Sequence, residues 1–334
     1  MFINKLFVNN NYLNIVILIV IGILIIQFSY VLLYIIIFIK KYFYTKEMDL
    51  PKRYGYNTWV LITGCSSGQG KKIAIQFARR NFNIILVGSK RIYGVETMLK
   101  EKYNIRTICI VKDFCNAHKK NFFNKITNTL NNLDGELSIL VNNVGHRVAW
   151  NPYHKMPTQK INDTIICGTI VQSRLTQIAI KHFLNRKMDY KSCIINITAM
   201  CMHKNFWFGE TGEFSVPYLS VYESANAFGY FHSNSIQKEY GDMIDILNIT
   251  PGAVLTENTS YLKDIPFNVD QHDFINTIFT LIGNYNGPQY GHWKHELSSI
   301  LANFMFFYKD KILESTGNII STNYMTQYNR SLEK

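Results

Sequence analysis

The longest apolar run of the chain lies near its N-terminus and predicts a transmembrane helix. Residues 15–39 form 25 consecutive positions without a charged side chain, and Gln27 is the one amide among them. A helix of this length spans a hydrocarbon core of about 30 Å with some tilt. A cleaved signal peptide has a shorter apolar region followed by small residues, and this segment has neither feature.

The charges that flank this run predict its orientation. Only Lys5 precedes the run, whereas several cations follow it closely: Lys40, Lys41, Lys46, Lys52 and Arg53. Because basic residues near a span stay on the cytosolic side, residues 40–334 are expected to face the cytosol. We therefore predict a membrane anchor over residues 1–45, with its transmembrane part at about 15–39.

Beyond the anchor, short apolar runs alternate with amphipathic stretches. The runs that we interpret as strands are "WVLITG" at 59–64, "NIILVG" at 83–88, "TICIVKDF" at 107–114, "LSILVNNVG" at 137–145, "CIINIT" at 193–198 and "DILNITPG" at 245–252. Helical stretches separate them, and this alternation is typical of a parallel sheet with crossover helices. The prediction is an α/β fold with a doubly wound parallel sheet at 46–262, followed by extra C-terminal helices at 263–334.

The first of these strands ends in a glycine-rich turn that indicates dinucleotide binding. Thr63, Gly64, Gly68 and Gly70 form the pattern T-G-x-x-x-G-x-G, and an amphipathic stretch follows them. Glycines let the backbone turn tightly and approach a diphosphate, which then lies at the positive end of the helix. With a strand before it and a helix after it, the pattern predicts a Rossmann-type sheet.

The residues that end the second strand favour NADP(H) over NAD(H). A domain that binds NAD usually places an acidic residue there, because a carboxylate binds the ribose hydroxyls. This chain has Gly88, Ser89, Lys90 and Arg91 instead. Cations at this point pair with a 2′-phosphate, although ordinary surface residues at the start of a helix remain the alternative.

Composition adds little to this prediction. The formal charge is +12, but Asn, Ile, Lys and Tyr are abundant throughout, so we favour compositional drift over a nucleic-acid site. The 47% hydrophobic content is too high for a disordered chain. The six cysteines form no C-x-x-C pair and no Cys/His spacing, so neither a metal site nor a disulfide framework is expected.

The order of the motifs resembles the short-chain dehydrogenases/reductases. After the glycine motif come N-N-V-G at 142–145, a tyrosine beyond the fifth strand (Tyr222) and Pro251–Gly252 beyond the sixth. Within that family, "DLPKRYGYNTWVLITGCSSGQGK" and "ILVNNVG" resemble the membrane-anchored very-long-chain 3-oxoacyl-CoA reductases, which are grouped with the 17β-hydroxysteroid dehydrogenases. The resemblance covers about residues 49–310 and is weaker after Gly145. It implies NADPH-dependent reduction of a 3-oxoacyl-CoA during fatty acid elongation, or of a steroid ketone, at the endoplasmic reticulum.

The resemblance also implies which residues bind NADP(H). The diphosphate loop would use Gly64, Ser66, Gly68 and Gly70. Lys90 would bind the 2′-phosphate, Asp113 would lie at the adenine, and Asn142 would lie beside the ribose. Further cofactor contacts are expected at Gly145, Pro251, Gly252 and Thr256. Thr256 would hydrogen-bond the nicotinamide carboxamide, and a simple helix-capping threonine is the alternative.

The catalytic positions depart from the family pattern. Family members use a tyrosine as proton donor, a lysine four residues later, a serine about thirteen residues upstream and an asparagine in the preceding helix. Tyr222 matches the tyrosine, but the other positions fall on Asn226, Ala199 and Gly168. A lysine lowers the pKa of the tyrosine and a serine stabilises the oxyanion, so their absence weakens the chemistry.

Two hypotheses follow from this mixture of kept and lost residues. The first is an NADPH-dependent reductase in which Tyr222 is the acid and Thr198, or a residue of the loop "HKNFWFGETGEF", replaces the serine. The second is a catalytically impaired pseudoenzyme, a membrane-anchored NADP(H)-binding scaffold or partner subunit. The expected partners are the membrane, a lipid-like acyl-CoA or steroid, and an elongation complex or a second copy of the chain.

Overall fold

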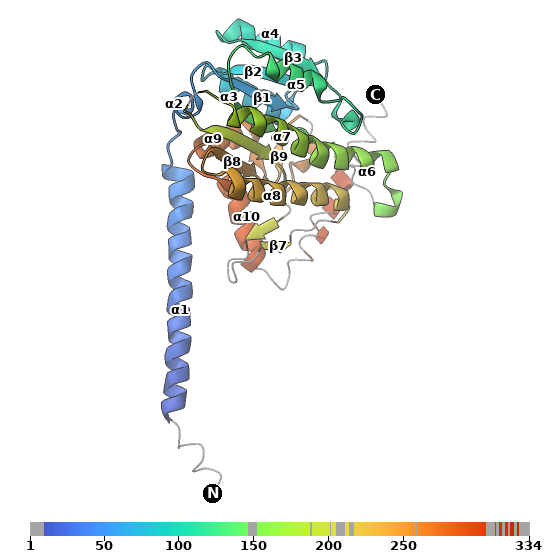
Figure 1. The fold of residues 1–334 in the computed structure, drawn as a ribbon. Helices are drawn as coiled ribbons and strands as arrows, with labels where there is room; N and C mark the ends of the chain where they lie inside the picture. Colours follow the sequence, from blue (N-terminus) through green and yellow to red (C-terminus); the bar gives the residue numbers. More distant parts are fainter. Residues whose placement is uncertain are drawn as a thin grey trace. The chain divides into compact units, whose positions relative to one another are not determined.

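The structure is a computed structural model that separates into two compact units, residues 1–45 and 46–334 (Figure 1). It describes residues 10–145, 152–187, 189–200, 202–204, 211–213, 217–257 and 259–304. Beyond these it describes residues 311, 314, 315, 318, 319, 321–323 and 326.

The described part of the first unit, residues 10–45, is almost entirely one long helix. Helix α1 runs over Asn10–Ile39 and continues as a π-helical turn, η2, over Lys40–Tyr44. Its large apolar side chains are exposed along the whole length, for example Leu18, Ile26 and Phe28. The segment Leu13–Tyr44 is long and apolar enough to cross a membrane, and within the described residues it is the one helix that meets this test.

The second unit is built on a parallel sheet of seven strands in the order β11-β8-β5-β4-β1-β2-β3 (Figure 1). The strands are β1 Trp59–Thr63, β2 Asn83–Gly88, β3 Thr107–Val111, β4 Leu137–Asn142, β5 Ser192–Ile197, β8 Ile244–Ile249 and β11 Gly287–Gln289. All neighbouring pairs are parallel. The predicted doubly wound α/β fold is therefore confirmed.

Helices cover both faces of this sheet and create two apolar cores. One face carries α3 (Gly68–Ala78), α4 (Ile92–Lys102) and α9 (Gln271–Leu281). The other face carries α5 (Asn124–Asn131), α7 (Val171–Leu184) and α8 (Ser220–Tyr240). Strands buried on both faces need nearly continuous apolar residues, which explains why they were recognisable in the sequence.

The remaining elements are short. They are α2 (Leu50–Tyr54), η3 (Phe114–Asn116), η4 (Tyr153–Lys155), α6 (Thr158–Ile165), η5 (Ile166–Ile170), η6 (Ser260–Leu262) and α10 (Trp293–Phe304). Two small sheets join β6 (Met202–Lys204) to β7 (Thr211–Glu213) and β9 (Val254–Leu255) to β10 (Val269–Asp270).

Strand β11 was not predicted from the sequence. Its residues are Gly-Pro-Gln, which no propensity argument assigns to a strand. The strand forms because β8 offers a free edge, with Gly287 opposite Leu247 and Gln289 opposite Ile249. The pairing places the residues that follow, up to α10, at the carboxyl end of β8.

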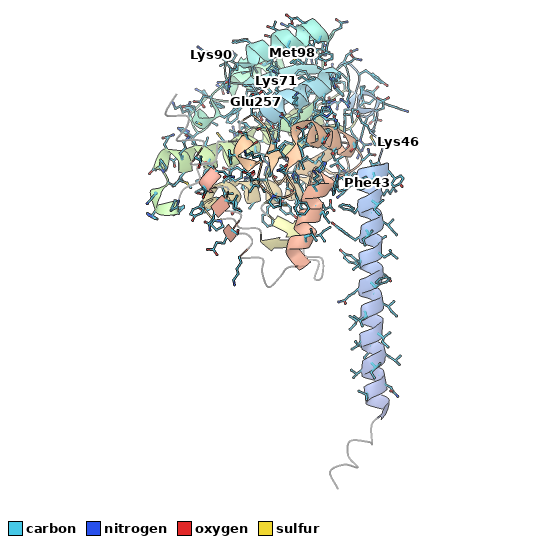
Figure 2. All side chains as sticks on the ribbon, turned by 180° about the vertical axis from the view of Figure 1, so that it is seen from behind. Phe43, Lys46, Lys71, Lys90, Met98 and Glu257 are labelled. Carbon is cyan, nitrogen blue, oxygen red and sulfur yellow. The ribbon has the colours of Figure 1, made fainter. Side chains whose placement is uncertain are left out.

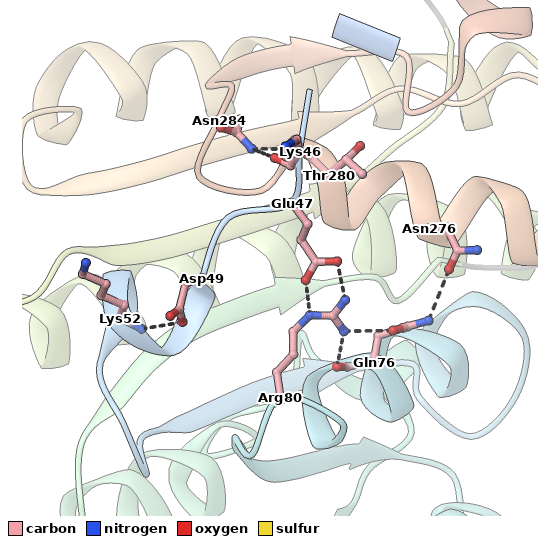
Figure 3. A network of polar contacts seen from close by, with 9 residues as sticks. All are labelled: Lys46, Glu47, Asp49, Lys52, Gln76, Arg80, Asn276, Thr280 and Asn284. Atoms are coloured by element: carbon pink, nitrogen blue, oxygen red, sulfur yellow. Dashed lines mark hydrogen bonds and ion pairs between the residues drawn. The ribbon is translucent and has the colours of Figure 1, made fainter. Parts of the chain in front are cut away.

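The segment that begins the second unit is held to the domain by polar contacts (Figure 3). The Arg80 guanidinium pairs with both carboxylate oxygens of Glu47 and also donates to Gln76. Asn284 donates to the Lys46 carbonyl at 2.9 Å. Residues 46–47 are therefore fixed against α3 and the end of α9.

A buried carboxylate anchors the helix that follows. Asp245, at the start of β8, is 1% exposed and accepts hydrogen bonds from Arg53 at 2.6 Å and from the Tyr54 hydroxyl at 2.8 Å. Hydrogen bonds from these partners hold the pKa of Asp245 below its usual value, although burial opposes the shift. The Lys191 ammonium is the third neighbour, with its Nζ 3.5 Å from Asp245 Oδ1. This cluster fastens α2 to the amino-terminal edge of the sheet.

Candidate functional site

The glycine-rich loop lies where the strand order reverses. Strands β1 and β4 are neighbours, and their crossover connections run to opposite faces, which opens a crevice at their carboxyl ends. Gly64 has φ +66° and Gly68 has φ +57°, a backbone conformation that favours glycine. A Cβ on Gly70 would lie 2.5 Å from both the Gly64 carbonyl oxygen and Asn143 Nδ2. The motif therefore contains glycines for two reasons: Gly64 and Gly68 have a positive φ, and the turn leaves no room for a side chain at Gly70.

Thr63 and Asn143 hold this loop in shape, a role that sequence reasoning missed. The Asn143 side-chain amide donates to the carbonyls of Thr63 and Gly64 at 3.0 and 3.2 Å. In return, the backbone amides of Asn143 and Val144 donate to the Thr63 hydroxyl. The motif N-N-V-G is the signal that could have revealed these contacts, because its second asparagine directly follows a buried strand. The loop is thus preorganised by the end of β4.

The start of α3 has the local chemistry that favours an anion. Ser67 occupies the N-cap, yet its side chain makes no capping hydrogen bond within the described residues, and no acidic residue lies in the first turn. The amides of Gly68, Gln69 and Gly70 belong to the first turn of the helix, where backbone amides have no intrahelical acceptor. Free amides and the helix dipole favour a phosphate group at this position.

The packing at the end of β2 explains why position 88 is a glycine and has no carboxylate side chain. A Cβ on Gly88 would lie 2.7 Å from Ser66 Oγ and 3.1 Å from Ile92 Cγ2. Ser66 accepts hydrogen bonds from the amide and the hydroxyl of Ser89 at 3.1 and 3.0 Å. The contact ties the glycine-rich loop to the next crossover and excludes a side chain at position 88.

Two lysines follow the segments that meet in the Ser66–Ser89 contact. Lys90 follows β2 and is exposed, and Lys71 lies in the first turn of α3; both are labelled in Figure 2. The two elements leave the sheet at adjacent strands, β1 and β2. This edge of the crevice is therefore positively charged and suited to a phosphate monoester.

Asp113 lies at the carboxyl end of β3. Its carboxylate accepts hydrogen bonds from the Cys115 amide and the Asn116 side chain, and it caps the short helix η3. The thiols of Cys115 and Cys167 lie 3.9 Å apart just beyond it. Burial raises the pKa of Cys115 to about 11, so this thiol stays protonated at neutral pH. Gly145, three residues beyond the end of β4, is exposed.

Three asparagines line up across the sheet below the crevice. Asn142, Asn196 and Asn248 are in register on β4, β5 and β8, and each is buried. Asn142 donates to Thr176 and to Asn196, and Asn196 donates to the Ser233 hydroxyl of α8 at 2.8 Å. Asn142 is thus a structural member of the sheet rather than an isolated polar residue.

Tyr222 is the third residue of α8, and Asn226 follows it one turn later. Both side chains are half-buried. The Asn226 amide nitrogen donates to the backbone carbonyl oxygen of Tyr222 at 2.7 Å. An asparagine bonded back to its own helix in this way contributes no positive charge to the tyrosine hydroxyl.

Gly168 lies in the π-helical turn η5, directly against α8. A Cβ on Gly168 would lie 2.9 Å from the Cβ of Ala225. The residue before Asn226 therefore excludes any side chain at the position where the family has an asparagine. Asn162, the nearest upstream amide, is exposed on α6.

The hydroxyl that we expected to replace the missing serine is already bonded to the sheet. Ala199 follows β5, and its neighbour Thr198 is 9% exposed. The Thr198 hydroxyl lies 3.1 Å from Asn248 Oδ1 and 3.2 Å from the Ile249 carbonyl oxygen, both acceptors for its proton. A hydroxyl held in this way does not donate to a substrate oxyanion. Cys201 and residues 205–210 and 214 of the aromatic loop lie outside the described residues.

The loop after β8 carries the remaining predicted residues. The Met200 amide donates to the Pro251 carbonyl at 2.9 Å, so this loop meets the end of β5 beside Ala199. Thr256 does not cap an α-helix, because its hydroxyl lies 2.8 Å from the hydroxyl of Thr259 in a local turn. Gly252 packs against His295 of α10, a residue that the sequence did not single out.

A family model described as short chain dehydrogenase matches residues 58–265 of this chain. Among curated proteins, 17-beta-hydroxysteroid dehydrogenase type 3 of Mus musculus is 27% identical over 208 residues, covering 62% of this chain and 63% of that protein. The chain thus spans less than two thirds of that relative. Very-long-chain 3-oxoacyl-CoA reductase of Aspergillus niger is 28% identical over 258 residues, covering 72% of this chain and 68% of the relative.

Solved structures support the same fold. A short-chain dehydrogenase from Sphingobium yanoikuyae in complex with NADPH superposes with a TM-score of 0.58 at 21% identity, covering 70% of this chain and 87% of the other. L-sorbose reductase from Gluconobacter frateurii, complexed with NADPH and L-sorbose, gives a TM-score of 0.55 at 20% identity, covering 68% and 89%. The dinucleotide loop, the strand order and the match over residues 58–265 agree: this chain belongs to the short-chain dehydrogenase family.

Proposed function

We propose that this protein is an NADPH-dependent carbonyl reductase whose substrate is a 3-oxoacyl-CoA or a steroid ketone. The observation that carries the proposal is the built dinucleotide loop, in which Gly70 approaches Gly64 and Asn143 too closely for any side chain. The relatives named for 3-oxoacyl-CoA reduction and for 17-beta-hydroxysteroid dehydrogenation suggest the substrate class.

The residues of the crevice fit NADP(H). The uncapped first turn of α3 would bind the diphosphate, and Ser66 would hold the loop around it. Lys90 would pair with the 2′-phosphate, since Gly88 leaves no place for a carboxylate that would repel it. Asp113 and Gly145 would border the adenosine half, and Pro251 to Thr256 would cover the nicotinamide. The bound cofactor supplies a hydride to the carbonyl carbon.

Tyr222 would donate the proton to the carbonyl oxygen. Tyr222 lies in the first turn of α8, which supports this role because the helix follows β5 in the sequence, and the hydroxyl would act at the nicotinamide end of the cofactor. The amide of Asn226 provides no charge beside it, and Gly168 and Ala199 provide no hydrogen-bond donor from their side chains. Each such group is worth about 10²- to 10⁴-fold in rate, so we expect slow turnover.

A scaffold without catalysis is the outcome that would replace this proposal. The altered positions 168, 199 and 226 motivated it, but the comparisons give it no support, because the named relatives are dehydrogenases and reductases. We therefore treat the scaffold as one possible outcome of the experiment below.

The proposed location is the endoplasmic reticulum membrane, with the catalytic unit in the cytosol. The apolar segment Leu13–Tyr44 supports a single-pass anchor. Cations at the C-terminal end of this segment and beyond it, beginning with Lys40, support this orientation. Proposed partners are the membrane, a lipid-like substrate, and elongation enzymes or a second copy of the chain.

The experiment uses the full chain in detergent micelles. NADPH binding is measured by fluorescence, and NADPH oxidation is followed with a 3-oxoacyl-CoA and with a steroid ketone. We expect tight NADPH binding and slow oxidation that Tyr222→Phe abolishes, while the exposed control Tyr93→Phe keeps the wild-type rate. NADPH binding without turnover, equal in wild type and Tyr222→Phe, would overturn the reductase proposal.

A further inference from the structure

A buried histidine connects α10 to the loop that follows β8. His295 is 1% exposed, and its ring nitrogen Nε2 lies 3.2 Å from the Ala253 carbonyl oxygen. The ring also lies close to the preceding residue, since a Cβ on Gly252 would be 3.0 Å from His295 Cδ2. One side chain therefore contacts two consecutive residues of this loop, from a position more than 40 residues away in sequence.

The chemistry of the contact fixes the state of the imidazole. The Ala253 carbonyl is an acceptor, so Nε2 must carry the proton. Burial lowers the pKa of His295 to about 4, so the ring is neutral at physiological pH and its single N–H points at Ala253. The backbone of Tyr290 lies on the ring as a second neighbour, so His295 is placed between the loop after β8 and the residues that precede α10.

The histidine itself is held firmly. The nearby Gly291 has φ +74°, and a Cβ there would lie 2.6 Å from Phe274 Cε2 and 2.8 Å from Ile249 Cγ2. At the start of α10, His292 Nδ1 accepts a hydrogen bond from the Lys294 amide. The hydroxyls of Tyr290 and Ser299 lie 2.9 Å apart. These contacts fix the residues on both sides of His295, and the rings of Phe274 and His292 each lie 6.0 Å from the imidazole, measured between ring centroids.

The loop that the histidine contacts is bonded at both of its ends. The Thr250 amide donates to Gln289, and the Pro251 carbonyl accepts from Met200. Val254 and Leu255 then pair with β10, and the Val269 amide of β10 donates to the Ala253 carbonyl at 3.0 Å. The Ala253 carbonyl oxygen therefore has two neighbours, the Val269 amide and His295, and His295 is the one that connects it to α10. Ligands of doubly wound sheets bind at these carboxyl ends, so the loop borders the proposed reaction site.

We infer that His295 is a positioning residue for the proposed reaction, because it holds residues 252–256 in the place where they cover the nicotinamide end of the cofactor. The inference rests on the proposed function. It is distinct from cofactor binding at the adenosine end, which depends on α3 and Lys90. Loss of the contact should therefore affect one half of the cofactor and leave the other half unchanged.

The test compares two variants of the full chain in detergent. His295→Leu fills a similar volume without a donor, and His295→Gln keeps an N–H donor. The surface histidine His272, on α9, provides the matched control His272→Leu because its side chain is 69% exposed. Affinities are measured for NADPH and for adenosine 2′,5′-bisphosphate, which contains only the adenosine half, and kcat is measured with the better substrate.

We expect His295→Leu to weaken NADPH binding by about 3- to 10-fold, the effect of one lost hydrogen bond. The affinity for adenosine 2′,5′-bisphosphate should stay within about twofold of the wild type. The kcat should fall by about 10- to 100-fold, because a misplaced nicotinamide slows the reaction. His295→Gln should recover most of both losses, and His272→Leu should match the wild type.

Other results overturn the inference. Equal losses for both ligands would mean that His295 only stabilises the fold, and an unchanged NADPH affinity and kcat would mean that it has no positioning role. A glutamine variant as poor as the leucine variant would also exclude the hydrogen bond as the cause. Failure of the proposed function looks different: the wild type itself would then not oxidise NADPH, while the ratio of the two affinities would still report on His295.

Discussion

The side-chain amide of Asn226 donates a hydrogen bond to the backbone carbonyl oxygen of Tyr222, at 2.7 Å. The residue one turn after the proposed proton donor is therefore bonded to the helix backbone. A lysine at this position would have a longer chain with an ammonium at its end, and α8 would not need to change its path. The missing charge is thus a local property of one side chain.

The first prediction follows from this contact. Asn226→Lys should raise the rate of NADPH oxidation by about 10-fold or more, because an ammonium near the tyrosine hydroxyl favours proton transfer. The measurement is kcat at neutral pH. Asn226→Gln, which is uncharged, serves as control and should leave the rate within about twofold. If both variants behave alike, the absent charge does not limit the reaction.

The second prediction concerns the contact between Gly168 and Ala225. Gly168→Ala should lower the free energy of unfolding by about 1–3 kcal/mol, because the new Cβ would lie 2.9 Å from that of Ala225. Adding Ala225→Gly should recover most of the loss, and thermal melting of the variants in detergent measures both effects.

Gly94 offers a matched control for this test. It lies in α4, and a Cβ there meets nothing within 4 Å. Gly94→Ala should therefore be neutral or stabilising by up to about 1 kcal/mol. Equal melting temperatures for Gly168→Ala and Gly94→Ala would contradict the close approach of η5 and α8.

The third prediction concerns cofactor choice. Lys90→Ala should weaken NADPH binding by about 10- to 100-fold, the worth of a hydrogen bond between charged groups, and should leave NADH binding unchanged. Lys100, which pairs with Glu96 on α4, gives the control Lys100→Ala. Fluorescence titration with both cofactors measures the ratio. An equal loss for NADPH and NADH would rule out a contact with the 2′-phosphate.

The fourth prediction concerns the buried cluster around Asp245. Asp245→Asn should cost about 2–3 kcal/mol of stability, somewhat less than the 3–5 kcal/mol typical of a fully buried pair because Arg53 is 27% exposed. Asp134→Asn is the control, since Asp134 pairs with Arg106 at the surface and is 94% exposed. Its effect should stay below about 1 kcal/mol.

The effect of Asp245 should depend on pH. Its pKa is lowered in the folded chain, so the unfolded chain binds more protons between the folded pKa and the unfolded value of about 3.9. Its stabilisation is therefore complete above about pH 5 and is lost as the pH falls below the unfolded value. The melting temperatures of wild type and Asp245→Asn should converge on acidification. A constant difference down to pH 3 would disagree with the ion pair.

Local patterns made several parts of this protein predictable. The buried strands had continuous apolar residues, and the predicted run at 59–64 corresponds to β1 at Trp59–Thr63. Gly64 and Gly70 were predictable because a tight turn near a helix start permits few other residues. By contrast, β11 was missed because its three residues become a strand only through the free edge of β8.

The sequence by itself determined the apolar segment, the alternation of strands and helices, the dinucleotide loop and the identity of the residues at 168, 199, 222 and 226. These features depend on neighbours within a few residues, or on a repeated period, so a linear pattern contains them. The tertiary structure alone decided that Ala225 excludes a side chain at Gly168, that the Thr198 hydroxyl is bonded to Asn248, and that His295 holds Ala253. These contacts join segments about 40 to 60 residues apart, and only the packing of helices on the sheet brings such atoms together.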